Sequence, residues 1–404
     1  MVRLSNVLRT EQTIILSGPY GTEVAERLAR DIATHPQKAA AVAVNKYIGA
    51  GCSALLTTEG RVYLSEIAAD YLSAPQVHMP VVLVTPTFRL AKQTLEAAAT
   101  VRGVDPHLPA MGLELCLDAV QICQTVRMSS GRSLSDTLLA MSLGPPFDCY
   151  KGEDTPRDVD QKYLPQIFAA IRFCHDLDYL MFETVPSLKA AKGAARAFTR
   201  AHQLLDVEDS KANFRNMGTI RYSDSLLSRA HYFGSETYAH LVPSYDPASK
   251  VFTQIPPTKE YVISLCLDKD GMLYEGPVDI PGKAPERLPL NDTLDAFYAT
   301  VEREGLCTPV GFGINCNSLA VTEQALASLS STNRSRMISI HPNASSEDDP
   351  RDYCNMTSQQ AIPEEDYVRQ VLRLKKTYGL GLIGGCCGTN GTTMRLLAQE
   401  CRKS

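Results

Sequence analysis

Tryptophan is missing from this chain of 404 residues, and so is any long run of apolar residues. A membrane-spanning helix needs about 18 or more consecutive apolar residues, so the sequence predicts no transmembrane segment and no membrane partner. The N-terminal stretch, MVRLSNVLRTEQ, also lacks the apolar core of a secretory signal. The expected location is the cytoplasm, with an organelle-targeting segment as the alternative because this stretch is basic.

Positive charge is not in excess either. The formal net charge is −5 at pH 7, which argues against nucleic acid or an anionic membrane as the main partner. No G-x-G-x-x-G motif follows a strand and opens a helix, so a Rossmann-type pocket for a nucleotide-bearing cofactor is not expected. The 12 cysteines contain no C-x-x-C pair, which excludes a redox motif of that type. Small molecules are therefore the expected partners.

Short apolar runs alternate along the chain with amphipathic stretches of helical spacing. The candidate strands are TIILSG (13–18), CSALLTT (52–58), PVVLVTPTF (80–88), LLAMSLGPP (138–146), LDYLMFETVPS (177–187), EYVISLCLD (260–268), TPVGFGINC (308–316), SRMISIHPN (335–343) and GLGLIGGCC (379–387). Strands that alternate with helices indicate βα units and a parallel sheet. We predict an α/β fold, a TIM-type (β/α)8 barrel, in which one candidate is extra or misread. An open, doubly wound sheet is the alternative.

A single domain over residues 10–402 accommodates all of these runs. Three stretches, near 103–134, 203–258 and 344–361, are polar, poorly periodic and broken by Pro, Asn and Ser. We expect them to be loop insertions in the barrel. No internal repeat or interdomain linker is present, and the sequence leaves the oligomeric state open.

Cysteines stand at the ends of two predicted strands. Cys316 ends one strand, and Cys386 and Cys387 end the last one. Because the carboxyl ends of barrel strands meet on one face, we expect all three thiols on the same rim. Three thiolates can hold a zinc ion and leave its fourth tetrahedral position for a substrate. Gly384 and Gly385 permit the bend that would turn both adjacent sulfurs inward.

Two other interpretations of these cysteines stay open. They can be packed, buried thiols, as most cysteines in a reducing compartment are. They can also belong to a closed structural zinc site, for which Cys354 or His341 would supply the fourth ligand.

Four segments of the chain carry a resemblance to a known family. They are GINCNS (313–318), IGGCCGT (383–389), FETVPS (182–187) and SLGPPFDCYKGEDT (142–155). Together they resemble the homocysteine S-methyltransferase family, whose members carry close variants of both cysteine motifs. The resemblance runs in order from about Gly18 to Thr389.

This resemblance implies an enzyme with a TIM-barrel fold that transfers a methyl group to the thiol of homocysteine and gives methionine. It implies that Cys316, Cys386 and Cys387 hold a catalytic Zn²⁺ that binds and activates the substrate thiol. It also implies that Glu183, in FETVPS, lies near the homocysteine amino group.

The segment GPYGTE (18–23) resembles a family motif near the N-terminus, D-G-G-x-G-T-E. Backbone amides at Gly21 and Thr22 are candidates for binding the substrate carboxylate, and a helix cap at Thr22 is the alternative. Ser17 is a further substrate-binding candidate, since it stands where the family usually has aspartate. Pro19 replaces the second glycine of the motif.

Other positions depart from the family or match it ambiguously. If the aspartate's role is transferred, Glu153 and Asp154 are the nearest replacement carboxylates by motif. His341 stands where members often have tyrosine. The family's second strand usually ends in Thr-x-Thr and an aromatic residue, which matches either TTEGRVY (57–63) or TPTF (85–88).

The methyl donor is expected to be S-methylmethionine or S-adenosylmethionine, with betaine as the alternative. A trimethylammonium group favours an aromatic cage, best made with tryptophan, which this chain lacks. A cobalamin-dependent enzyme would need further modules. Two rival functions remain: methyl transfer to another thiol or selenol, such as selenocysteine, and a zinc-bound sensor without catalytic activity.

Overall fold

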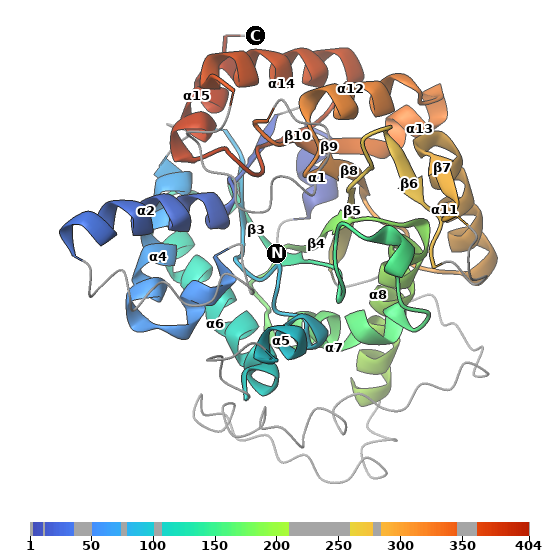
Figure 1. Cartoon of the computed structure of the whole chain (residues 1–404), viewed down its shortest axis with the longest axis horizontal. Coiled ribbons are helices and arrows are strands. Elements are labelled where there is room, and N and C mark those ends of the chain that lie inside the picture. The colour runs from blue at the N-terminus through green and yellow to red at the C-terminus, as the bar shows by residue number, and fades with distance from the viewer. Residues whose placement is uncertain are drawn as a thin grey trace.

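Eight parallel strands form a closed barrel in this computed structural model, in the order β1-β10-β9-β8-β5-β4-β3-β2 (Figure 1). The structure describes residues 3–10, 13–35, 51–73, 79–100, 107–209, 259–277, 284–345 and 362–403. The barrel strands are β1 (Ile14–Leu16), β2 (Val81–Val84), β3 (Thr137–Leu143), β4 (Tyr179–Val185), β5 (Glu260–Leu265), β8 (Gly311–Asn315), β9 (Met337–His341) and β10 (Leu382–Ile383). The predicted TIM-type barrel is confirmed.

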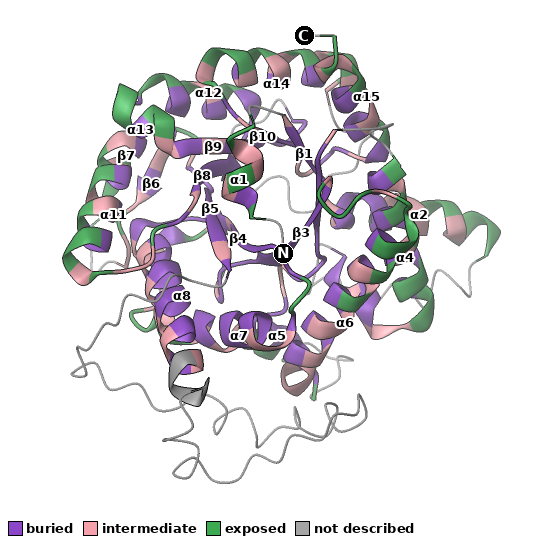
Figure 2. Cartoon of the chain, turned by 180° about the vertical axis from the view of Figure 1, so that it is seen from behind, coloured by how far each residue is buried: buried purple, intermediate pink, exposed green. Residues whose placement is uncertain are grey.

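Helices surround the barrel and turn their buried faces toward it (Figure 2). They are α2 (Tyr20–Thr34), α4 (Thr58–Ser73), α5 (Lys92–Ala99), α6 (Leu108–Ser129), α7 (Val159–Phe173), α8 (Leu188–Asp209), α11 (Leu290–Glu304), α12 (Leu319–Ala327), α13 (Ser331–Arg336), α14 (Glu364–Tyr378) and α15 (Gly391–Cys401). Between β5 and β8 the chain forms a small antiparallel hairpin, β6 (Met272–Tyr274) with β7 (Arg287–Pro289). Within the described ranges, no helix is long and apolar enough to cross a membrane.

The prediction of a strand at residues 52–58 is wrong. These residues form a 3₁₀ turn, η1 (Cys52–Leu56), and α4 begins at Thr58. Gly51 has a left-handed backbone (φ 77°) and sends the chain into this turn, and the Thr57 hydroxyl accepts a hydrogen bond from Gly60 N at 3.0 Å. The apolar run is buried, but it is buried as a helical turn. Periodicity alone does not separate a short buried strand from a short buried helix.

The expectation of a loop insertion near 103–134 does not hold. Most of this stretch is α6, which lies between β2 and β3 and packs against α4 and α5. The small side chains on its inner face are buried in the core, among them Cys116, Ala119 and Cys123. Residues 203–209 continue α8, whereas 210–258 and 346–361 lie outside the described residues. Insertions there, and the domain bounds 10–402, stay predictions.

The barrel interior is closed at its N-terminal end by α1 (Leu4–Leu8). Leu4 is fully buried in the cluster of apolar side chains inside the barrel, next to residues such as Leu138 and Val262. Ser5 is hydrogen-bonded through both its N–H and its hydroxyl to the carboxylate of Glu260, at the start of β5. The rim at the carboxyl ends of the strands lies at the opposite end of the barrel.

A buried ion pair joins α6 to the sheet. Arg127 Nη1 lies 3.0 Å from Asp178 Oδ2, and the two side chains are only 6% and 2% exposed. The same carboxylate oxygen accepts a hydrogen bond from Leu139 N, in β3, at 2.8 Å. The pair therefore fixes the entry to β4, the strand that carries Glu183 to the rim.

Asp178→Asn should lower the free energy of unfolding by about 3–5 kcal/mol, because the substitution leaves the Arg127 charge buried without a countercharge. Denaturant unfolding measures this change. The matched control is Glu323→Gln, which breaks the exposed pair with Arg373 and should cost less than about 1 kcal/mol. Equal effects of the two substitutions would contradict the assigned role of the buried pair.

Candidate metal centre

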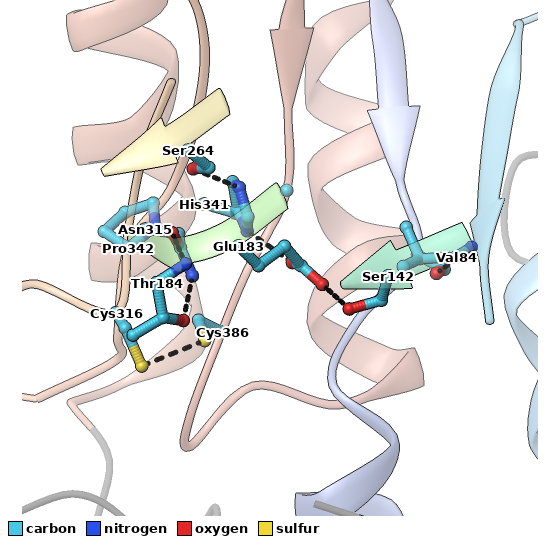
Figure 3. A network of polar contacts seen from close by, with 12 residues as sticks. Val84, Ser142, Glu183, Thr184, Ser264, Asn315, Cys316, His341, Pro342 and Cys386 are labelled. Carbon is cyan, nitrogen blue, oxygen red and sulfur yellow. Dashed lines mark hydrogen bonds and ion pairs between the residues drawn. The ribbon is translucent and has the colours of Figure 1, made fainter. Parts of the chain in front are cut away.

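The structure brings together the three cysteines that the sequence placed on one rim. Cys316 follows β8, and Cys386 and Cys387 follow β10. Cys386 Sγ is 3.5 Å from Cys316 Sγ (Figure 3). Cys387 Sγ is 3.9 Å from Cys316 Sγ, and all three sulfurs lie within 4.8 Å of one another. Thiolates bound at about 2.3 Å to a tetrahedral zinc are roughly 3.8 Å apart. The cluster therefore fits such an ion.

Two asparagines fix the backbone on either side of Cys316. Asn315 exchanges two 2.8 Å hydrogen bonds with Thr184, at the end of β4. Asn317 exchanges bonds of 2.9 and 2.7 Å with the backbone of Leu267, just after β5. Cys316 between them has a left-handed backbone (φ 59°), as does Thr184 (φ 55°). Such conformations persist in residues with a Cβ only where the surroundings impose them.

The turn that carries Cys386 and Cys387 is tied to β9 and to itself. Cys386 N donates to Pro342 O at 2.9 Å, and Ala344 N donates to Cys387 O at 3.0 Å. The hydroxyl of Thr389 donates to Cys386 O at 2.7 Å. A Cβ on Gly385 would lie 2.4 Å from this hydroxyl oxygen, so the glycine is needed for close approach.

Thr22 and Glu23 hold the cysteine turn from the first helix of the barrel. Gly388 N donates to Thr22 Oγ1 at 3.3 Å, and Gly391 N donates to Glu23 Oε1 at 2.6 Å. The hydroxyl of Thr22 thus lies close to the cysteines and supports the turn that carries two of them. Glu23 was missed by the sequence reasoning, although the G-T-E motif contained it. Gly21 lies in the first turn of α2, and its role in binding a carboxylate stays a prediction.

Ser17 is buried at the end of β1, where its hydroxyl oxygen accepts a hydrogen bond from Val84 N at 3.0 Å. This bond joins the ends of β1 and β2, just beyond the last paired residues of the two strands. No direct hydrogen bond joins Ser17 to Glu183 or to the cysteines among the described residues. The observed role of Ser17 is structural, and a role in substrate binding stays a prediction.

Glu183 lies inside the rim in a chain of polar contacts that crosses it (Figure 3). The hydroxyl of Ser142 donates to Glu183 Oε2, and His341 Nδ1 lies 3.6 Å from Glu183 Oε1. The other ring nitrogen of His341 is 3.0 Å from Ser264 Oγ. Burial raises the pKa of Glu183 to about 7, and burial lowers the pKa of His341 to about 3. The imidazole is therefore neutral and faces a carboxyl group that is readily protonated.

His341 does not complete a closed metal site, since its ring nitrogens face Ser264 and Glu183. In the described part of the chain, the metal-type cluster at the rim contains the three cysteines alone. Cys354, the other possible fourth ligand, lies outside the described residues. Binding of a substrate at a fourth metal position stays a prediction.

The ambiguity about the second strand is resolved, because TPTF (85–88) follows β2 whereas 57–63 begins α4. Thr85 Oγ1 accepts a hydrogen bond from Ser142 N at 3.3 Å, and Thr87 donates to Ser142 O at 2.5 Å. The two threonines also share a 2.8 Å hydrogen bond. They therefore position Ser142, which in turn holds Glu183.

A closed (β/α)8 barrel that gathers three sulfurs and a buried carboxylate at its carboxyl rim is the arrangement of a TIM-barrel enzyme with a thiolate metal site. The model of the family described as homocysteine S-methyltransferase matches residues 14–401, so the chain belongs to that family. The family transfers a methyl group to the thiol of homocysteine. The predicted methyltransferase is confirmed at this level.

Solved structures with the same fold include the homocysteine methyltransferase MmuM from Escherichia coli. Its metallated form has 17% sequence identity and a TM-score of 0.52, with 98% of each chain covered. Its oxidized form has 17% identity and a TM-score of 0.51, with 98% of this chain and 99% of that chain covered. At this identity the likeness supports the fold alone. A comparison with curated protein sequences gives no match.

The affinity for homocysteine, relative to its analogue 4-mercaptobutanoate without the amino group, should fall as the pH drops through about 7. Above this pKa Glu183 is ionised and compensates an ammonium group; below it the carboxyl is protonated and does not. Both thiols lose the same thiol proton on binding a metal, so the ratio of affinities isolates the carboxylate. Calorimetry should show a change approaching tenfold per pH unit below the pKa.

The control for this experiment is Glu183→Gln, in which the ratio should no longer change with pH. The substitution keeps the shape and the hydrogen bond from Ser142 but removes the charge. A ratio that stays flat in the parent protein would mean that Glu183 serves the scaffold and not the ammonium group.

Proposed function

We propose that this methyltransferase is zinc-dependent and that Cys316, Cys386 and Cys387 bind the metal. The observation that carries the proposal is the spacing of their sulfurs, 3.5 and 3.9 Å, at the carboxyl rim of the barrel. Three thiolates with an open fourth position are suited to binding a substrate thiol directly.

A bound zinc ion would supply one thing, a lowered pKa for the thiol that coordinates it. Free thiols have a pKa of about 8.5, so homocysteine is mostly protonated at neutral pH without this help. The protein supplies the geometry. Asn315 and Asn317 fix the sulfur of Cys316 between them, and the turn bonds of Cys386 fix the second sulfur.

Glu183 is suited to receive the ammonium group of homocysteine. It lies on β4, in contact with Ser142 and His341, and the next residue, Thr184, is hydrogen-bonded to Asn315 at the end of β8. The arriving ammonium stabilises the ionised carboxylate and offsets the cost of its burial. The substrate is then held at both ends, and the remaining barrier is reduced by orientation.

The donor in this proposal is a sulfonium, S-methylmethionine or S-adenosylmethionine, and betaine is the alternative. In the reaction an S–C bond forms to the homocysteine sulfur while the donor's S⁺–C bond breaks, and the donor leaves as a neutral thioether. The chain has no tryptophan for an aromatic cage around a trimethylammonium group, but its 17 tyrosines can supply such a cage, so this absence does not decide between the donors. Selenocysteine as the methyl acceptor is the rival function within the family.

The purified protein should contain about one zinc per chain, and Cys316→Ala or Cys386→Ala should remove it, because two thiolates rarely hold a catalytic zinc. Metal analysis of each variant measures this. Cys401→Ala is the matched control: Cys401 lies at the end of α15, away from the cluster, and its loss should leave the zinc in place. Full zinc in a Cys386→Ala, Cys387→Ala double variant would refute the ligand assignment.

Homocysteine incubated with the zinc-loaded protein and S-methylmethionine or S-adenosylmethionine should give methionine, at least about tenfold faster than with betaine. Chromatography of the products measures the rates, and Cys316→Ala serves as the inactive control. Faster turnover with betaine would reverse the choice of donor. Strong competition by selenocysteine would favour the rival acceptor, and zinc binding without turnover of any of the three donors would refute all of them as substrates.

A further inference from the structure

Tyr150 reaches the metal cluster from a loop that the proposed function has not used. The loop connects β3 to α7, and the Tyr150 hydroxyl oxygen lies 3.4 Å from Cys316 Sγ. Either atom can donate the hydrogen bond while Cys316 is a thiol. A metal-bound thiolate has no proton, so in the loaded site the tyrosine is the donor and the sulfur is the acceptor.

The position of Tyr150 is imposed by its neighbours. Tyr150 N donates to the side chain of Asp148 at 3.0 Å, which fixes the turn. Cys149 is buried and receives a 3.4 Å hydrogen bond from the guanidinium of Arg89. On the other side, a Cβ on Gly152 would lie 2.4 Å from Pro186 O, so the loop is packed closely against the end of β4. The contact with Cys316 is therefore a built feature of the rim.

A site of this kind has to select one sulfur out of several. The zinc ligands are thiolates, as is the bound substrate, and a sulfonium donor can methylate any of them that it reaches. A hydrogen bond donated to an anion is stronger than one between neutral groups and withdraws charge from the acceptor. A thiolate that accepts such a bond is a weaker nucleophile than one that does not.

We propose that Tyr150 protects Cys316 from methylation by donating a hydrogen bond to its thiolate, so that the substrate sulfur is the favoured acceptor. The inference rests on the proposed zinc site. In the unwanted reaction an S–C bond forms between Cys316 Sγ and the methyl carbon, and the donor's S⁺–C bond breaks. Its electron pair leaves with the donor as a neutral thioether, and Cys316 becomes a neutral thioether that no longer serves as an anionic ligand.

The test uses the zinc-loaded full chain without homocysteine and trimethylsulfonium as the methylating probe. Peptide mass spectrometry follows the methylation of Cys316, Cys386 and Cys387 over time. Tyr150→Phe keeps the ring and removes the hydroxyl, so methylation of Cys316 should become roughly tenfold faster or more while the other two cysteines change little.

A second readout does not depend on methyl transfer. In the cobalt-substituted protein, loss of the hydrogen bond raises the energy of the sulfur lone pairs, so the sulfur-to-metal charge-transfer band of Tyr150→Phe should move to longer wavelength. Asp148→Ala, which frees the turn without touching the hydroxyl, should give a smaller change of the same sign in both readouts.

The matched control is Tyr20→Phe. Tyr20 makes the same kind of contact, 3.6 Å from its hydroxyl oxygen to Cys123 Sγ, but with a cysteine outside the metal cluster. This variant should leave the methylation of Cys316 and the cobalt spectrum unchanged. An equal rise in Tyr20→Phe and Tyr150→Phe would overturn the inference.

The outcomes separate the inference from the function it rests on. A parent protein that binds no zinc defeats the proposed function. Equal methylation of Cys316 in the parent and in Tyr150→Phe, with zinc content intact, overturns the inference and leaves the proposed function standing. Loss of zinc from Tyr150→Phe also overturns it, since the contact would then hold the site together rather than protect it.

Discussion

The site depends on one constraint, the left-handed backbone of Cys316 between Asn315 and Asn317. A residue with a Cβ adopts this conformation only at a cost of order 1–3 kcal/mol. The two amides offset that cost by binding the ends of β4 and β5, through Thr184 and Leu267. The sulfur of Cys316 is thus aimed by contacts among three neighbouring strands. The position of this sulfur is a property of the closed barrel more than of the cysteine itself.

Much of the fold follows from the alternation of apolar runs and helical stretches. Eight of the nine candidate strands overlap a barrel strand, because a strand buried on both faces is a short apolar run bounded by polar residues. The run at 52–58 has the same composition but folds as a 3₁₀ turn, and the deciding feature is the backbone at Gly51. The helix at 108–129 was missed because its sequence begins after a stretch rich in turn-forming residues, which concealed its periodicity.

The site was predictable only in part. The strand-end rule placed Cys316, Cys386 and Cys387 together because parallel strands end on one face. It did not place His341 beside Glu183, or Tyr150 beside Cys316, since these contacts join strands and loops far apart in the sequence. Side chains that meet through tertiary packing leave no local pattern. For the same reason the hydrogen bond from Gly388 N to the hydroxyl of Thr22 was not predicted, and the binding of a substrate carboxylate by the backbone amides there stays a prediction.

Closing the barrel requires contacts between the two ends of the chain. The first strand pairs with the last, Ile14 with Leu382, and the start of α2 holds a turn more than 360 residues further along the chain. Such contacts have a high sequence separation, and the entropy of closing so long a loop must be overcome before they form. Cys316 precedes Cys386 and Cys387 by about seventy positions, and the turn that carries the latter two follows the final barrel strand, β10. The three thiols are therefore far apart in an open chain, and they meet only when the barrel closes.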